Sequence, residues 1–584
     1  MLKTPPNRHH WNQLLVVMIV GGTMLWQFIG AWQDSQTTDE AVHLAAGVSY
    51  WRTGDWRLNP EHPPLTKLLA AIPLLALRQL HLPLDRPAWS ERNQWLFGAA
   101  MVYGSIAGPF GPRLIMWLGR WPMIVLWGAI GLLIYSWSRQ RWGPTGGLVS
   151  LTFFAFDPNW LGHGHLVTND VAAAGFFFAS VWALDRLART PTWSRVLILT
   201  VLFAAAQLSK FSNLILWIII PLVGAVIASR GHSLFRWRWW WRMMVSLALI
   251  TPVLIWTTYG FEIERIDQDP RINQLWQERQ WLLESGQIAE QRSIVQQLVR
   301  WTDPNSASGQ WVTSVLQHSI PAYSYWRGVF STMTHNYAGH AAYLFGQFSL
   351  LGWWYYFPVA LAVKTPLVTV VLLLVAGWLG WERWRRHRRW PDDVWLLGLP
   401  PLLYFLWSLT SHINIGLRHI FPVYPFLWLW LGSLAAQPWP RWPGLRHWVI
   451  GLGLSLSVMT AFRAGSNTIG YFNALVGGTA GGHRVLLDSN LDWNQDLWRL
   501  RSFLNRQRFP EVHIVLFGSV PLEKIFPGAK PVLTDDDVGR GRRPSGVVTI
   551  SAGQLYNVNG PFKWLRSKSP QWRIGSSILV YDFR

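Results

Sequence analysis

Cysteine is absent from this chain of 584 residues, and charged residues make up only 14% of it. Without cysteine the protein can form no disulfide, no thiolate nucleophile and no cysteine-ligated metal site. No glycine-rich loop of the kind that holds a nucleotide phosphate opens a helix in the C-terminal part, and we find no internal repeat. The sequence therefore gives no sign of a nucleotide-binding domain or of a repeat protein.

Apolar and aromatic residues are abundant instead. Half of the residues are apolar, and 43 of them are Trp, a residue that favours the membrane–water interface. The first apolar run, from Leu14 to about Trp32, is long for a signal-peptide core and is followed by no small-x-small cleavage site. We interpret this run as an uncleaved first membrane span and the chain as a polytopic α-helical membrane protein.

The net charge of +21 is explained by membrane topology rather than by nucleic acid. With the N-terminus in the cytoplasm and alternating spans, the inner loops collect arginines such as those of 383–389. The short outer loops contain only Lys210 and Arg418, which is the positive-inside pattern. About eleven spans fit it: 13–32, 115–137, 146–162, 167–184, 196–209, 212–229, 243–259, 366–381, 394–410, 420–437 and 447–463.

The first two outer regions predicted by this topology are 33–114 and 260–365, within a transmembrane domain of residues 1–483. Residues 65–80 are too short and interrupted to span, so they predict an interfacial helix. Residues 270–330 predict amphipathic helices above the membrane. Residues 341–363 predict a re-entrant or interfacial segment, because a span there would break the alternation.

A third outer region, 464–584, ends in a segment of different composition. Residues 484–584 predict a small extracytoplasmic α/β domain, because β-branched runs alternate with helical stretches. The expected strands are 512–517, 546–552 and 576–583, and the expected helices are 495–507 and about 562–567.

An acidic pair, Asp39 and Glu40, directly follows the first span. A carboxylate at this place can take a proton from an attacking hydroxyl or orient it. The pattern Thr37-Thr38-Asp39-Glu40 is also a sensible helix start, and the pattern alone favours that capping role.

A second motif, Glu61-His62-Pro63-Pro64-Leu65-x-Lys67, closes the same segment, and its prolines impose an extended, rigid turn. His43 and His62 could ligate a metal with Asp39 or Glu61. No dense ligand spacing supports this, so hydrogen-bonding roles are favoured and no metal or other cofactor is expected.

Further polar residues are predicted at the same depth. Each alone suits a snorkelling anchor or a capped loop. Together they place several cations around one acidic site, which suits an anionic phosphate held beside a carboxylate. They are Lys67, Arg120, Asp170, Lys364, Arg418 and His419.

The order of these motifs resembles that of the polytopic GT-C glycosyltransferases. The acidic pair, the His-Pro-Pro-Leu-x-Lys motif and the later outer Lys364-Thr365-Pro366 are most similar to the bacterial branch related to protein O-mannosyltransferases and aminoarabinose transferases. Asn473 and the run LLDSNLDWNQDL at 486–497 resemble the C-terminal part of many bacterial members.

The resemblance implies a membrane enzyme that transfers a sugar from a polyprenyl-phosphate donor to an acceptor hydroxyl on the extracytoplasmic face, with inversion. It implies Asp39 as the catalytic carboxylate, with Glu40 beside it, and a donor phosphate held by Lys67, Arg120, Lys364 or Arg418. Glu61, His62, Asp170 and His419 would line the same site. Some relatives use a divalent ion. The α/β tail replaces the β-trefoil of eukaryotic O-mannosyltransferases, which leaves a protein acceptor in question.

Two other classes of protein remain open from the sequence. A flippase or transporter of lipid-linked sugars would also need many spans, but it more typically has charges deep within them or broken helices in symmetric halves. A membrane-anchored binding module would need far fewer than eleven spans. Polar residues that gather at one outward site would favour the transferase, and a polar path through the membrane centre would favour the transporter.

Overall fold

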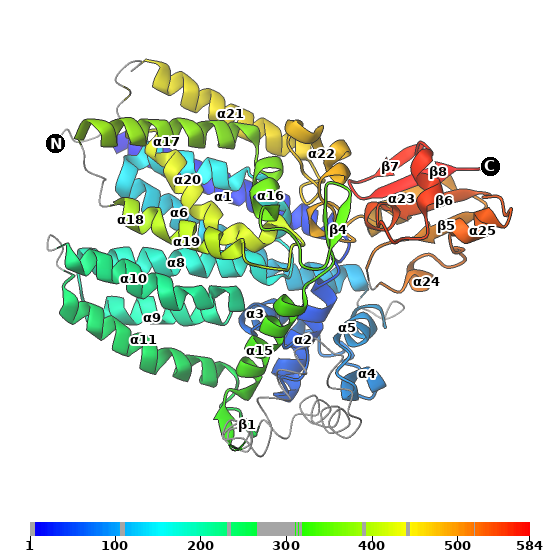
Figure 1. The fold of residues 1–584 in the computed structure, drawn as a ribbon, viewed down its shortest axis with the longest axis horizontal. Coiled ribbons are helices and arrows are strands. Elements are labelled where there is room, and N and C mark those ends of the chain that lie inside the picture. Colours follow the sequence, from blue (N-terminus) through cyan, green and yellow to red (C-terminus); the bar gives the residue numbers. More distant parts are fainter. Residues whose placement is uncertain are drawn as a thin grey trace.

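The computed structural model describes residues 6–104, 111–230, 235–265, 318–387, 393–437, 444–518 and 520–584, together with residues 310, 314 and 439. Most of the predicted amphipathic helices of 270–330 lie outside these residues. Long helices lie side by side and form one end of the molecule, which contains the N-terminus, and a small sheet with the C-terminus forms the other end (Figure 1).

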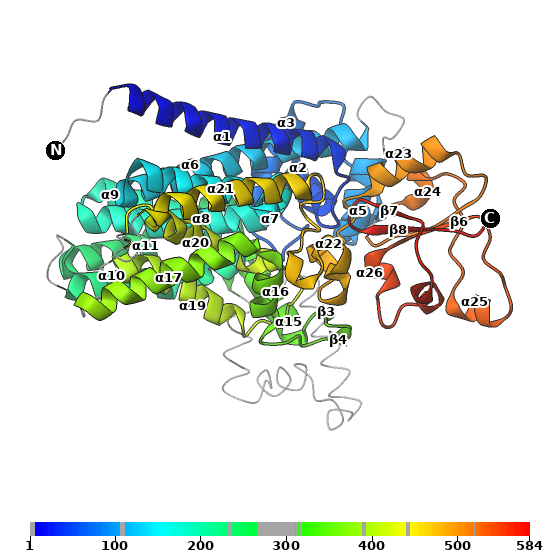
Figure 2. The same ribbon diagram turned by 90° about the horizontal axis from the view of Figure 1, so that it is seen from above.

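The helical part is built from helices that cover the predicted spans, some of which are divided between two elements. Figure 2 shows α1 along one edge of this bundle. The helices are α1 (Pro6–Gln33), α6 (Pro112–Ala155), α7 (Pro158–Gly164), α8 (Asn169–Arg189), α9 (Trp193–Gln207), η1 (Phe211–Ile215), α10 (Leu216–Ser229), α11 (Trp237–Thr258), α17 (Leu367–His387), α18 (Asp393–Leu397), α19 (Leu399–Ser408), η4 (Leu417–Val423), α20 (Tyr424–Ser433) and α21 (Leu445–Ala464).

Seven helices of the described residues are long and apolar enough to cross a membrane. One of them, α6, has 44 residues and includes the predicted span 115–137 and most of 146–162, and Gly143 with φ 76° separates the two. The spans predicted at 196–209, 394–410 and 420–437 fold as shorter helices. The polytopic helical fold is therefore confirmed, and the total of eleven spans stays a prediction.

Shorter elements lie between the helix bundle and the C-terminal sheet, and β1 lies at the lower edge of the molecule in Figure 1. The predicted interfacial helix is present as α3, and the stretch 341–363 forms a hairpin and a short helix, neither of them long enough to span. These elements are α2 (Glu40–Thr53), α3 (Leu65–Leu75), α4 (Pro87–Ser90), α5 (Gln94–Tyr103), β1 (Ile263–Arg265), β2 (Ser319–Pro321), α15 (Tyr323–Ala338), β3 (Ala342–Leu344), β4 (Gln347–Ser349) and α16 (Tyr356–Lys364).

The C-terminal part folds around a four-stranded sheet in the order β5-β6-β8-β7, with β5 and β6 parallel and the other pairs antiparallel. Val512 pairs with Val547, and Val547 in turn pairs with Asp582. The three predicted strands are present as β5 (Val512–Val515), β6 (Val547–Ser551) and β8 (Ile578–Asp582), whereas β7 (Trp572–Ile574) was not expected.

Short helices and turns connect these strands to each other and to the membrane part. They are η5 (Ala474–Val476), α22 (Gly478–Gly481), η6 (Gly482–Arg484), η7 (Asp488–Asn490), α23 (Leu497–Gln507), α24 (Leu522–Ile525), α25 (Asp535–Gly539), α26 (Ala552–Leu555) and η8 (Lys563–Ser567).

The C-terminal part shares a hydrophobic core with the first outer region. Leu497 and Ile514 belong to the same buried cluster as Leu44 of α2 and Phe97 of α5. This burial of apolar surface on both sides fixes the C-terminal part against the segment that follows the first span.

Candidate active site

Asp39 and Glu40 have different surroundings although they are neighbours. Asp39 occupies the N-cap position of α2, yet its side chain makes no capping hydrogen bond. Oε2 of Glu40 instead accepts the backbone N–H of Thr37 at 2.8 Å. Glu40 therefore binds the chain before α2, and the carboxylate of Asp39 makes no hydrogen bond at the start of the helix.

Glu40 forms a fully buried ion pair with Arg120. Nε and Nη2 of Arg120 donate to the two carboxylate oxygens at 2.9 and 2.5 Å, and the N–H of Val167 donates to Oε1 at 2.8 Å. Burial disfavours ionisation of Glu40, but the Arg120 guanidinium holds the pKa of this carboxyl below its usual range. Arg120 also donates to backbone carbonyls of the segment before α2, those of Ala31, Asp34 and Ser35.

This geometry removes Arg120 from the expected phosphate ligands and Glu40 from the expected catalytic residues. The N–H groups of the Arg120 guanidinium already donate to protein oxygens, and the side chain is fully buried. The pair fixes the chain between α1 and α2, which places Asp39.

Lys67 is likewise engaged by the protein. Its Nζ donates to the carbonyl oxygens of Asn59 and His62 at 2.8 and 2.7 Å and to the hydroxyl of Tyr50 at 3.1 Å. Burial lowers the pKa of Lys67 to about 7. Lys67 therefore holds the turn of the His-Pro-Pro motif, and the expected contact with a phosphate is not available to it in this arrangement.

Lys364 has a similar structural role. Its Nζ donates to the carbonyl oxygens of Ile469 and Asn490 at 2.8 and 2.6 Å, and the side chain is buried. Burial also lowers the pKa of Lys364 well below its usual value. Lys364 thus fixes α16 to η7 and, like Lys67, is not placed to bind a phosphate.

Arg418 is the predicted cation that reaches Asp39. Its Nη1 lies 3.5 Å from Oδ2 of Asp39 and 3.1 Å from Oδ2 of Asp170. Nζ of Lys210 lies 2.5 Å from the other oxygen of Asp170. Four side chains from distant parts of the sequence thus form one charged cluster, which we call the Asp39 cluster: Asp39, Asp170, Lys210 and Arg418.

Lys210 was not among the expected site residues, although the sequence contained a signal for it. It and Arg418 are the only basic residues of the short outer loops in the predicted topology. A cation that departs from the positive-inside pattern needs another reason for its position, and here that reason is Asp170.

Histidines surround the Asp39 cluster in their neutral form. The rings of His43 and His62 meet edge to face, with centroids 5.3 Å apart. Burial lowers the pKa of His62 well below its usual value, and burial, Lys210 and Arg418 do the same for His419. These rings therefore add hydrogen-bonding groups to the site without adding positive charge.

Glu61 lies to one side of the Asp39 cluster. Its carboxylate accepts hydrogen bonds from the side-chain amides of Asn59 and Gln94, both at 3.3 Å. Within the described part of the chain, no three His, Asp or Glu side chains are grouped as a metal site would require. Metal independence stays a prediction.

The segment that precedes the C-terminal sheet contacts the site directly, which the sequence did not indicate. The ring of Trp493 stacks under the guanidinium of Arg418, with the central carbon 4.2 Å from the ring centroid. The carbonyl of Trp493 accepts the N–H of Thr38 at 3.2 Å, next to Asp39. Trp493 therefore links the two groups that face each other in the Asp39 cluster.

We expect Arg418→Lys to lower kcat/KM by about tenfold or more. The guanidinium contacts two carboxylates and stacks on Trp493, and a compact ammonium cannot make all three contacts together. Steady-state kinetics measure the loss, with Arg386→Lys as the control because Arg386 pairs only with Glu382 of its own helix among the described residues. Equal rates for both variants would contradict this role of Arg418.

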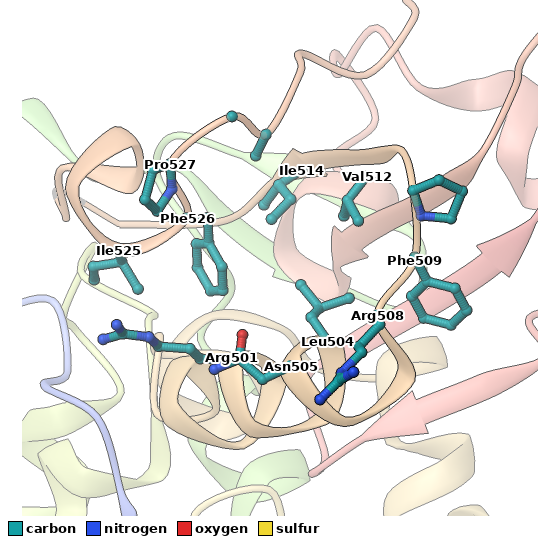
Figure 3. A pocket seen from close by; sticks show the side chains of 13 residues that line it. Arg501, Leu504, Asn505, Arg508, Phe509, Val512, Ile514, Ile525, Phe526 and Pro527 are labelled. Atoms are coloured by element: carbon teal, nitrogen blue, oxygen red, sulfur yellow. The ribbon is translucent and has the colours of Figure 1, made fainter.

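A surface pocket in the C-terminal part is separate from this site. Its volume is about 640 Å³, and its lining includes none of the predicted site residues. Figure 3 shows Arg501 of α23 and Arg508 just after this helix on one side and Phe526 on the other.

Comparisons with known proteins agree with the resemblance seen in the sequence. Residues 113–256 match the family model of dolichyl-phosphate-mannose-protein mannosyltransferases. No curated protein matches the chain. The match confirms the predicted resemblance to GT-C glycosyltransferases over this stretch, and it supports glycosyl transfer as the class of activity.

Two solved structures are similar to this chain. ArnT from Cupriavidus metallidurans bound to undecaprenyl phosphate is 12% identical, with a TM-score of 0.45 and 97% of each chain covered. The archaeal oligosaccharyltransferase AglB from Archaeoglobus fulgidus, in complex with an inhibitory peptide and a dolichol-phosphate, is 10% identical. Its TM-score is 0.43, with 79% of this chain and 56% of that chain covered.

Proposed function

We propose that the protein transfers a sugar from a polyprenyl-phosphate donor to an acceptor hydroxyl at the extracytoplasmic face of the cell membrane. The observation that carries the proposal is the state of Asp39. Its side chain is 21% exposed and makes no capping bond, and its one ion pair among the described residues is with Arg418. An accessible carboxylate beside a fixed guanidinium suits an attacking hydroxyl next to a leaving phosphate.

The reaction follows from these two groups. The acceptor oxygen attacks the anomeric carbon of the donor, and the bond from this carbon to the phosphate oxygen breaks. The electron pair leaves with the phosphate, whose growing charge Arg418 stabilises. Asp39 receives or orients the hydroxyl proton, and attack opposite the leaving group inverts the anomeric configuration. Since a phosphate is already a good leaving group, no general acid is needed.

The position of the Asp39 cluster supports transfer at one surface rather than transport through the bilayer. Asp39 precedes α2, Asp170 lies in the first turn of α8, Lys210 precedes η1, and Arg418 lies in the first turn of η4. These are ends of elements, not the middle of spans. The positive-inside pattern assigns this end of the bundle to the extracytoplasmic side.

A donor assay distinguishes the proposed transferase from a lipid-linked-sugar flippase. The purified protein in lipid vesicles is incubated with a panel of polyprenyl-phosphate sugars, and the lipids are analysed by mass spectrometry. The proposal predicts free polyprenyl phosphate from at least one donor. A donor that crosses the bilayer with its sugar still attached would identify a flippase and contradict the proposal.

A further inference from the structure

Hydrogen bonds from other segments of the chain hold Ser489 and Asn490 of the turn η7. Oγ of Ser489 accepts from Nε of Arg418 at 3.1 Å and donates to the carbonyl of Ile415 at 2.6 Å. The carbonyl of Asn490 accepts a hydrogen bond from Nζ of Lys364, and the side-chain amide of Asn490 donates to the hydroxyl of Tyr356 at 2.9 Å. Ser489 and Asn490 are buried, whereas Asp488 is partly exposed.

The backbone of Asp488 adopts a left-handed conformation, with φ 55°. A residue other than glycine pays a conformational cost there, and such residues cluster at functional sites. The hydrogen bonds of Ser489 and Asn490 stabilise this backbone conformation of Asp488. They hold the Asp488 carboxylate at the edge of the turn.

Asp488 directly precedes Ser489, whose Oγ accepts the hydrogen bond from Arg418 of the Asp39 cluster. Its Oδ1 accepts the N–H of Ser489 at 2.6 Å, and no hydrogen bond or ion pair to Oδ2 is found among the described residues. Burial raises the pKa of Asp488 to about 6. The positive charge of Arg418 lowers this pKa, and the negative charge of Asp39 raises it. Asp488 is thus next in the chain to a residue bonded to Arg418, and Arg418 contacts Asp39 directly.

We propose that Asp488 is a second carboxylate of the active site and binds a sugar hydroxyl through its free oxygen. The proposal rests on the proposed function. A carboxylate repels the donor phosphate, so its partner has to be a hydrogen-bond donor, and sugar hydroxyls are the donors that this reaction brings to the site. The hydroxyl belongs either to the sugar being transferred or to a glycan acceptor.

A purely structural role of Asp488 makes a different prediction. The turn itself uses the backbone carbonyl of Asp488, which accepts the N–H groups of Leu491 and Asp492, both at 2.9 Å. Asparagine tolerates the left-handed conformation and keeps an oxygen for the N–H of Ser489, so Asp488→Asn keeps the turn. Asp488→Gly keeps the backbone conformation but loses that hydrogen bond. Loss of function in Asp488→Asn therefore reports on the charge of the carboxylate.

The test combines binding and turnover of the full-length protein in detergent or vesicles. Thermal-shift titrations compare undecaprenyl phosphate, which has no sugar, with the polyprenyl-phosphate sugar that the wild type consumes. Initial rates are measured with that donor and with glycan acceptors. Asp582→Asn is the matched control, because Asp582 pairs with Arg584 on the surface of the C-terminal sheet.

We expect both Asp488 variants to bind undecaprenyl phosphate as the wild type does. Weaker binding of the sugar-bearing donor by about tenfold or more assigns the hydroxyl to the transferred sugar. Unchanged donor binding with a similar rise in acceptor KM assigns it to the acceptor. If the wild type is active and Asp488→Asn binds and reacts as the wild type does, the role of Asp488 is overturned and the proposed function is not. A wild type that consumes no donor would overturn the proposed function and this role with it.

Discussion

Asp39→Asn is expected to reduce sugar transfer by about a hundredfold or more while the protein remains folded in the membrane. The amide keeps the size of the side chain but can neither take a proton from the acceptor nor balance the charge of Arg418. The side chain makes no capping bond, so its replacement leaves the start of α2 intact. Release of polyprenyl phosphate measures activity, and size-exclusion chromatography and thermal unfolding measure the folded state.

The matched control for this variant is Asp535→Asn in α25, whose carboxylate lies in the C-terminal part and accepts the N–H of Trp564. It should leave the transfer rate unchanged. Near-normal turnover by a well-folded Asp39→Asn protein would remove Asp39 as the catalytic carboxylate. Asp170 and Asp488 would then be the remaining acids near Arg418.

Glu40→Gln is expected to have the largest effect on stability. The substitution leaves the Arg120 guanidinium buried without its counter-charge, and breaking a buried ion pair costs about 3–5 kcal/mol. Since the same carboxylate also accepts the N–H groups of Thr37 and Val167, the segment before Asp39 should loosen. Denaturation followed by intrinsic fluorescence or by proteolysis measures the loss.

Glu511→Gln provides the comparison for this prediction. Glu511 pairs with Lys530 on the surface, where water screens the two charges, so this substitution should change stability little. Equal stability of the two variants would show that the Glu40–Arg120 pair does not fix the segment between α1 and α2.

The parts of the fold that depend on apolar length and strand pattern were predictable. The runs 13–32 and 447–463 are continuous and apolar, and both are helices, α1 and α21. The strand β7 was not predicted, because a run of only three residues is too short to show a strand pattern. This strand forms because its backbone pairs with the edge of β8, and that pairing depends on the tertiary fold.

The site was only partly predictable. The sequence predicts how deep in the membrane a basic side chain lies, but not which group it binds. Arg120 and Arg418 were predicted at the same depth, and only the fold shows that Arg120 is enclosed by Glu40 and the chain before it. Arg418 is the one that contacts Asp39. Trp493 and Asp488 could not be assigned from pattern, since they reach the site through the docking of a segment more than 400 residues away in the sequence.

The central claim is that Asp39 and Arg418 act together on one glycosidic bond to phosphate, Asp39 on the acceptor and Arg418 on the phosphate. A cryo-electron microscopy structure of the Asp39→Asn protein with an intact polyprenyl-phosphate sugar tests it most directly. The account predicts the phosphate in hydrogen-bonding contact with the Arg418 guanidinium and the anomeric carbon next to the side chain of residue 39. A phosphate bound elsewhere, in the pocket beside α23 or among the spans at the membrane centre, would contradict it.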